Sequence, residues 1–120
     1  MSRVPCVFCA IVAGEGPAVV VREWDDVIAI RPLRPVTSGH VLVIPHAHVA
    51  DLGDDPSVSA RAMTCAAELA ATLPAANVIT SKGSAATQTV FHLHVHVVPR
   101  CEGDGLPLPW TPQQTTNHAA

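Results

Sequence analysis

Three histidines stand at every second position of one apolar segment, at His92, His94 and His96. The residues between them are Leu and Val, so the segment alternates as a half-buried β-strand does. Side chains two residues apart in a strand point to the same face, which places the three imidazoles in one row about 13 Å long. Imidazole can act as a nucleophile, a proton carrier or a metal ligand near neutral pH. The row therefore predicts a strand over about residues 90–98 that carries a functional site on one face.

The composition is that of one globular domain. The chain has 120 residues, of which 48% are hydrophobic and 14% charged, and this balance allows a buried core. The net charge of −3 has no basic cluster behind it, which argues against binding to nucleic acid. No apolar run reaches the length of a membrane span, and the N-terminus lacks the pattern of a signal peptide. We expect a cytosolic protein with neither a nucleic-acid nor a membrane partner.

Hydrophobic periodicity predicts an α+β fold. Apolar residues recur at helical spacing over residues 56–73, after acidic N-cap residues and a proline suited to a first turn. A short helix or turn is expected near the N-terminus, and four short apolar runs read as strands besides the histidine strand. These segments are residues 6–13 for the short helix and 18–21, 27–30, 41–44 and 77–80 for the strands. Strands in hairpin order with one long helix favour a mainly antiparallel sheet.

Further candidate ligands lie outside the row. Cys6-x-x-Cys9 is, in an intracellular chain, more typical of a metal site or a redox pair than of a disulfide. Together with the histidine row and with His46 and His48, it could supply a tetrahedral zinc site, whereas a redox pair needs only the two cysteines. The loop at residues 81–89 offers backbone N–H groups, hydroxyls and an amide that could contact a phosphate.

The sequence His92-Leu93-His94-Val95-His96-Val97-Val98 resembles the signature of the histidine triad superfamily of nucleotide hydrolases and transferases. The match extends to residues 88–91 and 99–100. Upstream, residues 37–45 resemble the family segment that leads into its central strand, and residues 6–15 resemble the opening of its bacterial zinc-containing members. These blocks stand in the family's order. The resemblance implies a HIT-like fold: a five-stranded mainly antiparallel sheet, one long helix and a short N-terminal helix.

The resemblance also implies one domain over residues 1–120, with a core at 6–110 and a tail at 111–120, and a homodimer. The expected activity is cleavage at the α-phosphate of a nucleoside phosphoramidate or dinucleoside polyphosphate, with a purine nucleotide derivative as substrate. His94 is the implied nucleophile, which forms a nucleotidyl-histidine intermediate. His96 is expected at the phosphate or leaving group, and His40 is expected to support the row by a hydrogen bond.

Two further sets of residues follow from the same resemblance. Gln88 and Thr89 match positions that contact phosphate oxygens or the departing atom. The implied zinc ligands are Cys6, Cys9, His48 and His92, which would make the metal structural because four protein ligands leave no open position.

Two positions depart from the family pattern, and other functions compete with the enzyme. Pro32 stands where members commonly have an acidic residue that contacts the ribose, and Ser81 stands where an asparagine often contacts the nucleotide. These departures favour, as an alternative, a nucleotide-binding or interaction module with little turnover. A catalytic metal bound by the three histidines themselves is a weaker alternative, because ligands in a straight row suit a tetrahedral site poorly.

Overall fold

The structure, a computed structural model, describes residues 6–110 of the chain. A five-stranded sheet forms its centre, with strand order β1-β2-β3-β5-β4 and antiparallel pairing throughout. The strands are β1 (Val20–Glu23), β2 (Val27–Ile30), β3 (Val41–Pro45), β4 (Ala76–Ile79) and β5 (Val95–Pro99). The helices are α1 (Val7–Val12), α2 (Pro56–Ala70) and the 3-10 turn η1 (Ser84–Ala86). The α+β fold predicted from the sequence is confirmed, and the expected tail at residues 111–120 lies outside the described residues.

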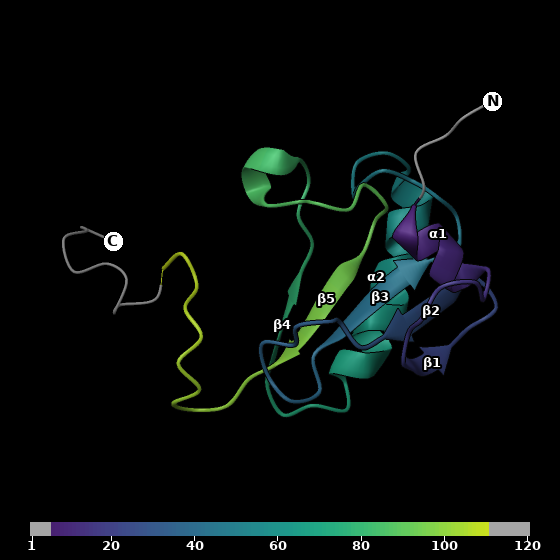
Figure 1. The fold of residues 1–120 in the computed structure, drawn as a ribbon. Helices are drawn as coiled ribbons and strands as arrows, with labels where there is room; N and C mark the ends of the chain where they lie inside the picture. The colour runs from purple at the N-terminus through teal and green to yellow at the C-terminus, as the bar shows by residue number, and fades with distance from the viewer. Residues whose placement is uncertain (1–5, 111–120) are drawn as a thin grey trace.

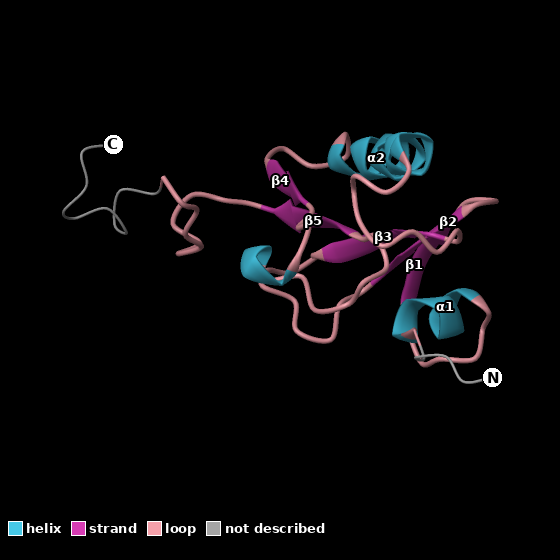
Figure 2. Cartoon of the chain, turned by 90° about the horizontal axis from the view of Figure 1, so that it is seen from above, coloured by secondary structure: helices cyan, strands magenta, loops and turns pink. Residues whose placement is uncertain are grey.

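The two α-helices cover opposite faces of the sheet, as the view from above shows (Figure 2). One buried cluster joins α2 to the sheet and includes Ala62, Cys65 and Ala66, all 0% exposed. The other cluster places Phe8 and Ile11 of α1 against the opposite face. The sheet is therefore buried on both sides at its centre, and a side chain that projects from β3 or β5 lies either under α2 or on the α1 face.

Helix α2 begins where the sequence predicts. The Asp55 carboxylate accepts a hydrogen bond from the Ser57 backbone N–H, and Pro56 occupies the first turn, where a missing N–H costs nothing. Its buried face carries small side chains, which let the helix approach the sheet closely. The helix ends at Ala70 rather than at Leu73, because the backbone tightens at its C-terminus: the N–H of Leu73 bonds back to the carbonyl of Ala70.

The histidine segment is shorter as a strand than predicted. The prediction of a strand over residues 90–98 is wrong at its start, since β5 begins at Val95, and its pairing with β3 ends at Val43 opposite Val95. The preceding residues leave the ladder because the Leu93 N–H bonds to the Val49 carbonyl in the loop after β3. Leu93 and Val95 pack in the α2 cluster, so the alternation of faces persists through the irregular part.

The other boundaries lie within two or three residues of the predictions, and β2 matches its predicted range. Figure 1 shows residues 101–110 leaving the sheet at the end of β5. Their first turn is held by Arg100, whose Nε donates to an Asp104 carboxylate oxygen at 2.8 Å. Among residues 6–110, no helix has the length and apolar composition that crossing a membrane would require.

Candidate functional site

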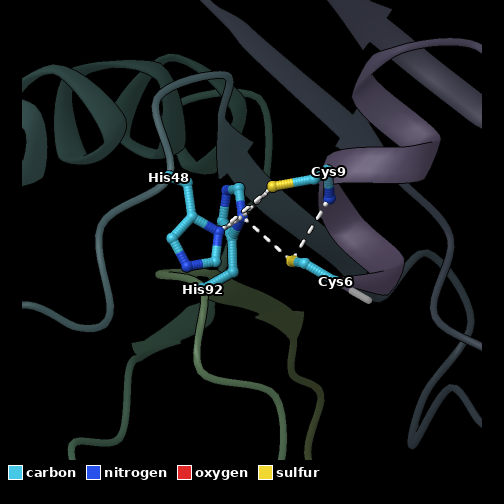
Figure 3. A group of neighbouring side chains, drawn as sticks. All are labelled: Cys6, Cys9, His48 and His92. Carbon is cyan, nitrogen blue, oxygen red and sulfur yellow. Dashed lines mark hydrogen bonds between the residues drawn. The ribbon is translucent and has the colours of Figure 1, made fainter. Parts of the chain in front are cut away.

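Four sulfur and nitrogen ligands from three separate segments meet beside the sheet (Figure 3). Cys6 is the residue before α1 and Cys9 lies within it, His48 comes from the loop after β3, and His92 comes from the segment before β5. The Nδ1 atom of His92 lies 3.4 Å from the Cys6 Sγ, 3.5 Å from the Cys9 Sγ and 3.1 Å from the His48 Nδ1. The four ligand atoms all lie within 4.8 Å of one another. The fold thus brings together the four predicted zinc ligands.

This donor set fits zinc in chemistry and in size. Around a tetrahedral zinc with Zn–S near 2.3 Å and Zn–N near 2.0–2.1 Å, ligand atoms stand roughly 3.3–3.8 Å apart. The separations from His92 Nδ1 to the two sulfurs, 3.4 and 3.5 Å, lie in this range, and the 3.1 Å to His48 Nδ1 lies slightly below it. The Nε2 of His92 lies 2.8 Å from the Pro45 carbonyl oxygen, which only accepts, so Nε2 carries the proton. The Nδ1 lone pair therefore faces the other three ligands. A histidine that binds a metal typically donates its other ring N–H to an acceptor in this way, which fixes its tautomer.

Local sequence explains the position of the two cysteines. Cys6 is the N-cap residue of α1, and its Sγ accepts a hydrogen bond from the Cys9 backbone N–H at 3.3 Å. Residues at i and i+3 lie on one face of a helix, so both sulfurs project to the same side. Phe8 and Ile11 of the same helix are buried against the sheet. Helix α1 therefore packs on the sheet by one face while its N-terminus presents the two thiols.

His94 is held by the main chain of His92, which belongs to the group of four candidate metal ligands (Cys6, Cys9, His48 and His92, called the metal group below). Its Nδ1 lies 2.8 Å from the carbonyl oxygen of His92, so Nδ1 carries the ring proton and the Nε2 lone pair remains available in the neutral ring. The ring is partly exposed. It lies edge-to-face with Phe8, at 5.0 Å between centroids, and 5.3 Å from the ring of His96. An accessible imidazole with a fixed tautomer suits nucleophilic attack.

His40 and His96 form a chain of hydrogen bonds with one direction. The backbone N–H of Val36 donates to Nδ1 of His40 at 3.1 Å, so the proton of neutral His40 is on Nε2. That Nε2 lies 2.9 Å from Nδ1 of His96 and donates to it. In neutral His96 the proton is therefore on Nε2, the ring nitrogen turned away from His40. A backbone amide thus determines which nitrogen of His96 donates.

Burial favours the neutral forms of His40, His92 and His96 by lowering the pKa of each. The pKa of His96 falls from 6.5 to about 4, chiefly because burial disfavours the charged form, with further contributions from the neighbouring His94 and His40. Burial also lowers the pKa of His40. The pKa of His92 is lowered by burial as well, against an opposing effect of its bond to Pro45. Neutral rings preserve the donor directions described above near neutral pH.

The loop before the histidine segment is organised around Gln88, which is only 4% exposed. Its Oε1 accepts the Gly83 N–H, and its Nε2 donates to the carbonyls of Ala50 and Val90. Three backbone groups therefore use the amide, and the contact of Gln88 with a phosphate stays a prediction. Thr89 is exposed on the same loop.

The two departures from the family pattern remain open to solvent. Pro32 and Ser81 are partly exposed. The described part of the chain shows neither side chain in a hydrogen bond with the histidine row.

Three contributors to the site escaped the sequence reasoning. Phe8 stands between the two cysteines and contacts both His92 and His94, at 5.9 and 5.0 Å between centroids; an apolar residue inside a Cys-x-x-Cys pair was its available signal. The Thr80 hydroxyl donates to the His94 carbonyl at 2.8 Å. The role of Val36 rests on its main chain, which side-chain identity cannot reveal.

The fold and the site define a class of protein. A model of the HIT domain matches residues 13–103, and the chain belongs to this family. An uncharacterized HIT-like protein of Mycobacterium tuberculosis is 43% identical over 109 residues, which cover 85% of this chain and 76% of that protein. Adenylylsulfatase HINT3 of Arabidopsis thaliana is 33% identical over 95% of this chain, which spans 60% of the plant protein.

Solved structures extend the likeness to the metal. A Zn-bound histidine triad family protein from Mycobacterium smegmatis superposes with a TM-score of 0.76 and 42% identity, over 86% of this chain and 80% of that chain. A HIT family hydrolase from Clostridium thermocellum gives a TM-score of 0.75 at 31% identity, over 90% and 99% of the two chains. The predicted place in the zinc-containing bacterial branch is confirmed, and the Cys6, Cys9, His48 and His92 group can hold the ion.

Proposed function

We propose that this protein is a nucleotide hydrolase or nucleotidyl transferase that works through a covalent intermediate on His94. The observation that carries the proposal is the hydrogen bond from His94 Nδ1–H to the His92 carbonyl at 2.8 Å. It leaves a lone pair on Nε2 of a partly exposed imidazole, which is what an attacking nucleophile needs. Membership in the HIT family and the likeness to a HIT family hydrolase support the same activity.

The reaction has two displacements at phosphorus. The Nε2 lone pair of His94 attacks the α-phosphorus, a P–N bond forms, and the bond to the leaving group breaks with its electron pair on that group. The leaving group, an amine or a phosphate, then takes up a proton. Water attacks the nucleotidyl-histidine, gives up a proton and displaces His94, which releases a nucleoside monophosphate. Splitting one displacement into two easier ones is the advantage of covalent catalysis.

We propose that His96 and His40 support the reaction because their hydrogen bonds fix which ring nitrogen of His96 is a donor. Nε2–H of His96 is the donor that we assign to a phosphoryl oxygen or to the leaving atom, and His40 holds that donor in place through its 2.9 Å contact. Exposed Thr89 and partly exposed Ser81 are proposed to contact substrate from the loop. We assign Gln88 an indirect role, because its amide holds the loop closed.

Zinc, when bound by Cys6, Cys9, His48 and His92, would fix α1 and the segment before β5 in place. Four protein ligands occupy a tetrahedral ion fully, so the metal would be structural and would take no part in the displacement. Ligation requires deprotonated, reduced thiols, which supports the cytosol as the compartment.

The remaining assignments concern substrate, assembly and domain. A nucleoside phosphoramidate or dinucleoside polyphosphate, with a purine base, is the proposed substrate class; the plant relative's name, adenylylsulfatase, is compatible with an adenylyl group. A homodimer through β4 is supported by the position of that strand at the sheet edge and by exposed Val78 and Ile79. We further propose one domain, with residues 6–110 as its core.

The test is release of nucleoside monophosphate from adenosine and guanosine phosphoramidates. His94→Ala is expected to lower kcat by about 10³-fold or more, the usual cost of losing a nucleophile, while zinc content and circular dichroism stay unchanged. His46→Ala, a histidine outside the row, is the matched control and should retain turnover. Mass spectrometry after a single-turnover pulse, with the protein kept at neutral or alkaline pH because acid hydrolyses the P–N bond, should detect the nucleotidyl group on the wild-type peptide that contains His94.

Two results would oppose the proposal. Full turnover in His94→Ala would exclude the covalent mechanism. Tight nucleotide binding by the wild-type protein without any labelling of His94 would favour the binding-module alternative instead.

A further inference from the structure

Phe8 lies where the metal group and the row of histidines meet. It belongs to α1, between the ligands Cys6 and Cys9, and is 7% exposed. Its ring meets the ring of His92 at 83° and the ring of His94 at 75°, with centroid distances of 5.9 and 5.0 Å. Both are edge-to-face contacts, the arrangement that aromatic rings prefer. One side chain of α1 therefore touches both a metal ligand and the proposed nucleophile.

The ring of His94 has neighbours on two sides and one hydrogen bond. Phe8 packs against it at 5.0 Å, and the ring of His96 lies at 5.3 Å. The hydrogen bond from its Nδ1 to the His92 carbonyl sets the orientation of the ring in the present rotamer, but this bond is lost if the side chain changes rotamer. Because the ring is partly exposed, other rotamers are open to it once a neighbour is removed. Phe8 is the neighbour that lies outside the histidine segment and the sheet.

We propose that Phe8 is a positioning residue for His94, and that the Cys6, Cys9, His48 and His92 group controls the position of Phe8. This inference rests on the proposed function of His94. It assigns to the metal group an effect on the nucleophile beyond stability of the fold.

Helix α1 depends on its ligands because it is very short. It has six residues, whereas an isolated helix is marginal in water even at twice that length. Two of its anchors are the sulfurs of Cys6 and Cys9, and the other two are buried Phe8 and Ile11. Loss of the metal removes the first pair, so α1 and the Phe8 ring move more freely against the sheet.

A second link runs through His92 itself. Its Nδ1 faces the cysteine sulfurs, its Nε2 bonds to the Pro45 carbonyl, and its own carbonyl accepts the His94 Nδ1–H. Metal ligation thus holds the side chain of the residue whose main chain orients the nucleophile. The two links reach His94 from different directions, one through packing and one through a hydrogen bond.

The experiment replaces Phe8 in the zinc-loaded protein and follows His94 directly. In Phe8→Leu we expect unchanged zinc stoichiometry, an unchanged KM and a two- to tenfold fall in single-turnover rate at saturating phosphoramidate, the range set by one edge-to-face contact. Imidazole ¹⁵N spectra of the wild type should show His94 protonated at Nδ1, with slow exchange of that proton with water. Phe8→Leu should exchange it faster, and wild-type protein treated with a chelator should do the same.

Phe91→Leu is the matched control. It makes the same change at the other phenylalanine of the chain, which is 48% exposed and directly precedes His92. This variant should alter neither the rate nor the exchange of the His94 proton.

The other outcomes either decide against the inference or are resolved by the second measurement. A change in KM alone would place Phe8 at the substrate. Unchanged rate and exchange in Phe8→Leu would remove its positioning role. If Phe8→Leu loses zinc, the chelated wild type still gives the answer, since retention of slow exchange there would overturn control by the metal. A wild type that forms no nucleotidyl-histidine refutes the proposed function, while the ¹⁵N measurement continues to test the coupling.

Discussion

Acid should destabilise the folded protein through His96, and the size of this effect follows from its burial. The pKa of His96 is lowered from 6.5 to about 4 in the folded state, with burial as the main cause. Above pH 7 the ring is neutral in both states and contributes nothing to the pH dependence. As the pH falls through 6.5, the unfolded chain binds a proton that the folded chain excludes, so stability declines. The decline ends near pH 4 and totals about 3 kcal/mol, of which about 2 kcal/mol is lost by pH 5.

The assay is urea unfolding of the wild type and of His96→Gln at pH 7, 6 and 5. Glutamine does not titrate and can still accept the bond that His40 Nε2–H donates to His96 Nδ1. The free energy of unfolding of the wild type should fall by about 2 kcal/mol more than that of the variant between pH 7 and pH 5. Zinc content is measured at each pH as a control. Protonation of the metal ligands should affect the two proteins equally, so that the difference between them reports on His96. Equal losses in the two proteins would refute a strongly lowered pKa for His96.

Two further changes test packing and backbone strain. Leu93→Ala should lower the free energy of unfolding by about 2–5 kcal/mol, because Leu93 is 1% exposed. Leu33→Ala should change it by less than about 0.5 kcal/mol, because Leu33 is fully exposed. Similar costs for the two variants in urea titrations would contradict the core assignment. Thr87 is the non-glycine residue with positive φ in the described chain, at 73°, and β-branched residues are strained there. Thr87→Asn should increase the free energy of unfolding by about 1 kcal/mol and so raise the midpoint of thermal unfolding. A lowered midpoint would show that the strain is absent.

The sequence was sufficient for the elements whose signals are local. The range of β2 and the first residue of α2 could be predicted because the apolar run at residues 27–30 and the cap at Asp55 and Pro56 are contiguous. The start of β5 could not. It depends on a hydrogen bond from Leu93 to Val49, 44 residues earlier in the chain, which draws the segment out of the ladder. Periodicity describes which face a side chain takes and leaves open whether its backbone is paired.

The site shows the same division between local pattern and tertiary contact. The alternation of histidines placed three rings on one face, and the family resemblance gave a ligand set that the fold does gather within 4.8 Å. The contact of the Gln88 amide with Ala50, a residue 38 positions away, could not be read from the local pattern. The tautomer of His40 depends on the Val36 N–H, and the packing of Phe8 depends on the approach of α1 to the sheet. These facts exist only once the chain has folded.

The spacing of the metal ligands along the chain has a consequence during synthesis. Cys6 precedes its partner His92 by 86 residues along the chain. At roughly 5–20 residues per second, a ribosome needs about 4–17 s to cover that interval. Throughout this time at least Cys6 is already part of the nascent chain, while the last ligand has not been polymerised. A site with all four ligands therefore cannot form before His92 has been made, and the thiols must stay reduced until then if they are to bind a metal.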